Sequence, residues 1–132
     1  MSGPTLPIDQ GTQRYITVTN LRDAHKQVLN PTGWTITAMA RQGSVRGPLV
    51  ATWRDDPGAG EYLAEVVDAD PLIDPTVQPG EKWVYLHVDP SASNAWTWVT
   101  AELWVNLAEP SPGVRSESWQ AHLQLNRSSI YT

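Results

Sequence analysis

The chain contains no cysteine and no phenylalanine among its 132 residues. Without thiols it can form neither a disulfide framework nor a thiolate metal site or nucleophile. Its aromatic residues are seven tryptophans and four tyrosines. Because Trp and Tyr carry a polar group and favour partly hydrated positions, this skew favours contact surfaces over a plain apolar core.

Basic residues are few and apolar runs are short. Nine lysines and arginines stand against fourteen acidic residues, giving a formal net charge of −5. Proteins that follow phosphates need a stripe of Lys and Arg, so we expect no nucleic-acid partner. No apolar run approaches the length of a membrane span, so we expect no membrane partner. The start, MSGPTLPIDQGTQ, lacks the basic cluster and apolar core of a secretory signal, and none is expected.

The motifs of common active sites are also missing. None of the three histidines stands in an HExxH pattern or at the close spacing of a zinc site. The chain has no GxSxG elbow for a serine nucleophile and no glycine-rich phosphate loop. Glu102 lacks an obvious carboxylate partner for glycosidase chemistry. We therefore expect no catalytic residue, no cofactor and no metal, and predict that the chain is not an enzyme.

A short acidic segment leaves one alternative open. Asp68, Asp70 and Asp74 lie beside prolines, and oxygen-rich loops of this kind can hold Ca²⁺. An EF-hand loop starting at Asp68 would need Gly and Glu where Ile73 and Pro79 stand. Hydrogen bonds from the aspartates to backbone amides within turns are the favoured interpretation.

The apolar residues alternate along short pieces of chain that eleven prolines and nine glycines separate. A period of two is typical of half-buried strands, and no window shows a convincing helical period. The predicted strands are 14–19, 34–40, 49–53, 61–67, 82–88, 96–107 and 116–126. The chain length suits one domain with a core of useful size.

These strands predict an all-β fold over residues 14–126. The expected architecture is a single antiparallel β-sandwich, Ig-like or jelly-roll-like, of about seven strands, with a small closed barrel as the alternative. Residues 1–13 are expected to form an extended N-terminal arm, and 127–132 a C-terminal tail. Segment 68–80, DADPLIDPTVQPG, has too many prolines for a ladder strand and is expected to cross between the two sheets.

The segment WTWVTAELWV, residues 96–105, raises the question of what covers its tryptophans. In an extended chain its tryptophans fall on one side and its aliphatic residues on the other. KWVYLHV, residues 82–88, separates its aromatic and aliphatic residues in the same way. If the two strands are neighbours, one sheet face collects the candidate interface or ligand-binding residues Trp83, Tyr85, Trp96, Trp98 and Trp104.

Three explanations of this aromatic face compete. The faces could be reversed, directly or by a β-bulge, so that the tryptophans fill the core. The face could be an assembly interface, because Trp and Tyr are enriched where subunits meet and so large an exposed patch is a liability for a monomer. It could also be a platform on which aromatic rings stack against sugars, although only Glu102 and Asn106 offer hydrogen bonds beside them.

Three stretches carry a resemblance to a known family. The stretch YITVTNLRDAHKQVLNPTGWTITAMARQG, residues 15–43, resembles the opening of the immunoglobulin-like β-sandwich modules of tailed-phage virion proteins, such as the upper baseplate family. GEYLAEV, residues 60–66, and QPGEKWVYLHV, residues 78–88, look like later strands of the same modules. The residues that fit the pattern of the first stretch are Asp23, Pro31, Thr32, Gly33, Trp34, Ile36 and Arg41. The resemblance carries over no individual site residue.

The resemblance implies a non-enzymatic bacteriophage virion structural protein, either a capsid decoration (head) protein or a tail or baseplate component. Its expected partners are other virion proteins, such as major capsid or tail proteins, and further copies of itself in the assembly. Docking would use the aromatic face and the terminal arms, on a particle assembled in the host cytoplasm. The alternative function is a carbohydrate-binding module or host-adhesion protein that uses exposed tryptophans on a glycan.

Overall fold

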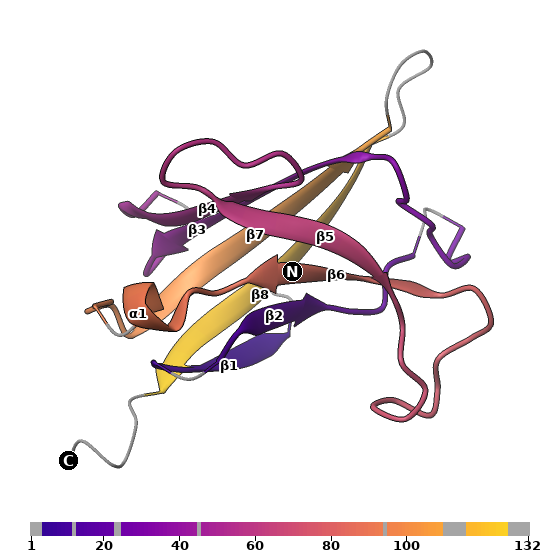
Figure 1. Cartoon of the computed structure of the whole chain (residues 1–132), viewed down its shortest axis with the longest axis horizontal. Helices are drawn as coiled ribbons and strands as arrows, with labels where there is room; N and C mark the ends of the chain where they lie inside the picture. Colours follow the sequence, from indigo (N-terminus) through magenta and orange to yellow (C-terminus); the bar gives the residue numbers. More distant parts are fainter. Residues whose placement is uncertain are drawn as a thin grey trace.

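The computed structural model describes residues 4–11, 13–22, 25–44, 46–93, 95–109 and 116–126. Within these ranges the protein is all-β, as predicted, with one short helix, α1 (Pro90–Ser93) (Figure 1). The strands are β1 (Thr5–Asp9), β2 (Tyr15–Val18), β3 (Thr35–Gln42), β4 (Leu49–Arg54), β5 (Tyr62–Asp68), β6 (Lys82–His87), β7 (Thr100–Ala108) and β8 (Ser116–Asn126). None of the helical residues described makes a segment long and apolar enough to span a membrane.

The eight strands form one sheet in the order β1-β8-β7-β3-β4-β5-β6-β2. The sheet curls until its end strands, β1 and β2, approach one another, so that it nearly closes into a barrel (Figure 1). The prediction of a purely antiparallel sheet is wrong for two pairs, β1–β8 and β4–β5, which run parallel. β4 and β5 pair at only two positions, where the end of β4 lies beside the start of β5. The chain leaves β4, makes a loop and continues as β5 in the same direction.

The expected N-terminal arm contains a strand. Thr5–Asp9 pairs along its whole length with β8, so the boundary at residue 14 is wrong for this segment. Ile8 is fully buried and Leu6 packs against the core, while Pro7 points outward. Proline lacks a backbone N–H and is tolerated on an edge strand, where its outer side needs no ladder partner. Residues 127–132, the predicted tail, lie outside the described ranges.

The core lies inside the curled sheet and follows the alternation of its strands. On β7 the inward residues Leu103, Val105 and Leu107 are buried, and small Ala38 and Ala40 of β3 lie opposite this row. Burial of such aliphatic side chains stabilises by about 1.5–3 kcal/mol each. The inward rows therefore hold β3 and β7 rigidly and leave their outer rows to face solvent.

Segment 68–80 does not cross between sheets. It joins β5 to β6, which are adjacent and antiparallel, with Asp68 opposite Lys82. The expected crossover is therefore wrong, and the segment is a long hairpin loop that projects from one end of the barrel (Figure 1). Its prolines are nevertheless excluded from the ladder, which is the physical reason why the hairpin is long.

Candidate functional site: the Trp104 face

The predicted single aromatic face required strands 82–88 and 96–107 to be neighbours in the sheet. They are not neighbours. Three strands, β3, β4 and β5, lie between β6 and β7 in the sheet. The strand expected from Trp96 also begins later, at Thr100. The five predicted aromatic residues are consequently not gathered on one face of the molecule.

Trp83 and Trp98 are buried, and neither indole N–H has a hydrogen-bond partner among the residues described. Trp98 belongs to the hydrophobic core. Trp96 packs against that core, with its ring centroid 5.3 Å from that of Trp98. The side-chain amide of Gln10 donates to the Trp96 carbonyl at 2.9 Å and to the Ser93 carbonyl at 3.1 Å, which ties the segment before β7 to the end of β1.

Tyr85 lies in a cluster on the outside of β2, β5 and β6. Its ring stacks on Tyr15 at a centroid distance of 4.6 Å, and His87 meets Tyr15 edge-on at 5.4 Å. His87 Nε2 is 2.9 Å from Glu65 Oε1. Tyr85 is thus covered in part by its own neighbours, and Tyr15 is the exposed ring of the group.

Trp104 is the member of the predicted set that is exposed on the outer surface of the sheet. Its side chain is 42% exposed, and Met39, directly opposite on β3, is 39% exposed. On the other side of Trp104 the register partner is Gln120 of β8. Cross-strand partners on one face have Cβ atoms about 4.5–5.5 Å apart, so this row forms a continuous surface.

A charged row runs beside the aromatic row. Arg41 of β3 is opposite Glu102 of β7, which is in turn opposite His122 of β8. His122 Nδ1 lies 2.5 Å from Glu102 Oε1, and the Arg41 guanidinium donates to the Gly47 carbonyl at 3.2 Å. We call the two rows together the Trp104 face; its members are Met39, Arg41, Glu102, Trp104, Gln120 and His122.

A hollow of about 120 Å³ lies on this face, between Met39, Arg41, Glu102 and Trp104. Two of its walls are apolar, one is cationic and one is a carboxylate. Such a site can bind an apolar group flanked by a charge or by hydrogen-bonding groups. It has no nucleophile paired with a base, which covalent catalysis would need.

Sequence reasoning selected Trp104 and missed Met39, Arg41 and His122 as its neighbours. The alternation of each segment places those side chains outward, and that signal is present in the sequence. What the sequence lacks is the register, because a strand can slide along its partner by two residues without changing its buried face. The order β3-β7-β8 and its pairing were needed to bring the six residues together.

The acidic segment that contains Asp70 and Asp74 forms hydrogen bonds within turns, as the favoured interpretation of the sequence predicts. Asp70 Oδ1 accepts the Leu72 N–H at 2.8 Å, and Asp74 Oδ1 accepts the Thr76 N–H at 2.9 Å. The hydroxyl of Thr76, with its N–H, holds the pKa of Asp74 below its ordinary value. Asp68 forms an ion pair with Lys82. Among the residues described, no group of three or more His, Asp or Glu side chains is placed to hold a metal ion.

Comparison with protein-family models, with curated proteins and with solved structures found no significant match to this chain.

Proposed function

We propose that this chain is a non-enzymatic structural protein of a bacteriophage virion, in the head as a decoration protein or in the tail or baseplate, and that it docks on neighbouring subunits through the Trp104 face. The observation that carries the docking role is the exposed pair Trp104 and Met39 on a rigid strand pair. Tryptophan and methionine are enriched in the cores of protein interfaces, and charged groups form the rims. The virion assignment rests on the resemblance of the sequence motifs to phage modules.

We further propose that the domain is an Ig-like or jelly-roll-like sandwich. The two-pair joint between β4 and β5 divides the sheet into a five-stranded part, β1-β8-β7-β3-β4, and a three-stranded part, β5-β6-β2. A strand that passes from one layer to the other makes this kind of joint at the corner of a sandwich. The joint supports the proposal, which a crystal structure of this protein would test.

The docking role is tested with Trp104→Ser and a matched control. Val99 is also an exposed apolar residue, but it precedes β7 and lies outside the Trp104 face, so Val99→Ser is the control. Virions produced from genomes that carry each substitution are purified, and the copy number of the protein is measured by quantitative mass spectrometry. We expect Trp104→Ser to reduce incorporation at least tenfold and Val99→Ser to leave it unchanged. Equal incorporation of both variants would contradict the docking role.

A specific observation favours a second function, carbohydrate binding. The sequence offered only Glu102 and Asn106 beside the rings, whereas the sheet register also places Arg41, Gln120 and His122 around Trp104. An aromatic ring flanked by directional polar side chains suits the apolar face and hydroxyl rim of a sugar.

The carbohydrate function is tested on glycan arrays. Wild-type protein and Val99→Ser should bind the same glycans, and Trp104→Ser should lose the signal. Glu102→Gln should weaken it, because the carboxylate accepts hydrogen bonds from hydroxyls more strongly than an amide does. Absence of wild-type binding to any glycan would exclude this second function without affecting the first.

A further inference from the structure

The loop between β5 and β6 displays two large apolar side chains at the surface. Leu72 is 93% exposed and Ile73 is 66% exposed, the highest values among the large apolar residues described. They are adjacent in the sequence, between Asp70 and Asp74. Single exposed apolar residues are ordinary, but two adjacent ones on a projecting loop form a knob that can insert into a pocket.

The knob is held in a fixed shape by the loop itself. The Asp70 carbonyl accepts the backbone N–H groups of Ile73 at 3.0 Å and Asp74 at 3.1 Å. The carboxylates of Asp70 and Asp74 each accept a further backbone N–H two residues on. A segment already ordered in the free protein loses little conformational entropy when it binds, so the two apolar side chains can contribute most of their burial to affinity.

The same chain carries a surface that complements this knob. The hollow of the Trp104 face has about 120 Å³ between the apolar side chains of Met39 and Trp104. A dry cavity of roughly 150 Å³ admits a guest as large as benzene, so the hollow suits one branched aliphatic side chain. The size and the apolar walls therefore fit Leu72 or Ile73.

Charge also matches between the two surfaces. The loop places two carboxylates beside the knob, those of Asp70 and Asp74. The hollow has Arg41 at its edge, and its guanidinium offers five N–H donors, one of which donates to the Gly47 carbonyl. Glu102, the acidic member of the hollow, is hydrogen-bonded to His122. An acidic knob is thereby directed toward the cationic edge.

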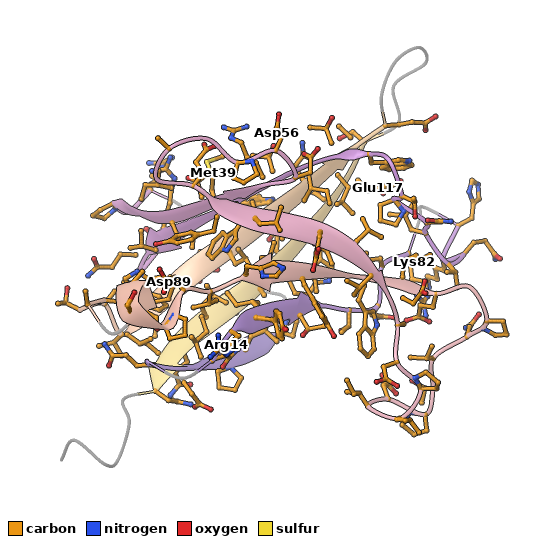
Figure 2. All side chains as sticks on the ribbon, in the orientation of Figure 1. Arg14, Met39, Asp56, Lys82, Asp89 and Glu117 are labelled. Carbon is orange, nitrogen blue, oxygen red and sulfur yellow. The ribbon has the colours of Figure 1, made fainter. Side chains whose placement is uncertain are left out.

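The knob and the hollow lie on different parts of the molecule, so one copy cannot fill its own hollow. The loop extends from β5 and β6, whereas the hollow lies on β3 and β7, which β4 separates from β5. In Figure 2, Met39 of the hollow and Lys82, just after the loop, are well apart. A contact between two such distinct surfaces is heterologous: it joins copies head to tail, into a ring or a filament.

We propose that the knob formed by Leu72 and Ile73 of one copy inserts into the hollow of the Trp104 face of a second copy. This inference rests on the proposed docking function of that face and names its occupant. Subunits of a ring or a tube in a particle would meet repeatedly through this one contact. A modest affinity at each contact then suffices, because several contacts act together in a closed assembly.

The proposal is tested by sedimentation velocity of the purified full-length chain, alone and in mixtures. Wild-type protein should form dimers and larger species as its concentration rises to about 1 mM, the weak end of specific association. A knob variant, Leu72→Asp with Ile73→Asp, and a hollow variant, Trp104→Ser, should each raise the self-dissociation constant about 30-fold or more, as the loss of an interface hot spot does. Arg41→Glu should raise the self-dissociation constant at least tenfold, because the new carboxylate would face the carboxylates of Asp70 and Asp74. Val99→Ser should leave it unchanged.

The mixture distinguishes a heterologous contact from any other. The knob variant keeps an intact hollow and the hollow variant keeps an intact knob, so an equimolar mixture should form heterodimers and nothing larger. Circular dichroism of each variant confirms that it is folded. A wild-type monomer at every concentration, or a mixture that does not form heterodimers, would overturn the proposal.

These results are separable from the test of the proposed function. If the wild-type chain stays monomeric while Trp104→Ser still abolishes incorporation into virions, a different subunit occupies the face: the docking function holds and the knob contact fails. If self-association behaves as expected but Trp104→Ser is incorporated normally, the knob contact holds and the docking role in the virion fails.

Discussion

Two buried tryptophans of the core, Trp53 and Trp98, differ in whether the indole N–H donates a hydrogen bond. In Trp53, which is buried in the core, Nε1 donates to the His87 carbonyl at 2.8 Å. In Trp98, equally buried in the core, Nε1 has no partner among the protein atoms described. A buried donor without a partner costs about 1–3 kcal/mol, so the same side chain stabilises these two sites to different extents.

This difference predicts opposite behaviour of two matched substitutions. Both Trp53→Phe and Trp98→Phe reduce side-chain volume in the core. Only the first removes a hydrogen bond, the one to the His87 carbonyl, and only the second removes a donor without a partner among the described residues. We expect Trp53→Phe to lower the free energy of unfolding by about 1–2 kcal/mol more than Trp98→Phe does. Urea titrations followed by circular dichroism measure both, and a larger loss for Trp98→Phe would contradict the hydrogen-bond assignment.

At the scale of elements, the Glu61 carboxylate helps to hold the connection between β4 and β5. Glu61 Oε2 accepts a hydrogen bond from Arg54 Nε at 2.7 Å, and its Oε1 accepts the Gly58 N–H at 2.8 Å. These contacts, the Arg54 hydrogen bond first, lower the pKa of Glu61 from its ordinary 4.5. The loop that carries the chain from β4 to β5 is thus shaped by a charged group at the surface.

The lowered pKa predicts how stability depends on pH. A carboxyl group with a lower pKa in the folded than in the unfolded protein binds its proton less readily when folded. Its contribution is therefore fully present above about pH 4.5 and is lost as the pH falls through the lower folded value. We expect the free energies of unfolding of wild-type protein and Glu61→Gln to differ most at neutral pH and to converge below pH 4.5. Chemical denaturation at a series of pH values measures this, and a constant difference would contradict it.

For the whole molecule, the N-terminal segment completes the sheet. β1 supplies fully buried Ile8 to the core and pairs with β8 over five residues. Gln10, buried just after β1, donates to carbonyls on either side of the turn that precedes β7. The nearly closed shape therefore depends on contacts between the first residues described and the last strand (Figure 1).

Removing side-chain volume from β1 should destabilise the whole domain. Ile8→Ala should lower the free energy of unfolding by about 2–5 kcal/mol, as other large-to-small core substitutions do. Pro7→Ala, at the neighbouring exposed position, should stay within about 0.5 kcal/mol of the wild type. Both are measured by urea unfolding in one cooperative transition. Equal effects of the two substitutions would mean that the segment behaves as the loose arm expected from sequence.

Local pattern alone predicted most strands, because the period of side-chain burial is a property of each segment. The strand Ser116–Asn126 has the predicted bounds, and β2 to β6 differ from prediction by a few residues at most. β1 was not predicted: the segment was assigned to an arm, and its pairing with the distant strand β8 is not a property of the segment itself. Trp96 and Trp98 were predicted to lie on a strand, but β7 begins only at Thr100. α1 and the turn after it come before the strand.

The sequence by itself determined that the protein is all-β, where most strands lie and which side of each is apolar. Those properties are encoded in the alternation of residue types within each segment. The tertiary structure decided the order of the strands, and with it that Trp104, unlike Trp83 and Trp98, is exposed beside Met39, Arg41 and His122. Strand order depends on contacts between residues far apart in the chain, and a pattern that repeats every two residues carries no information about which strand will be its neighbour.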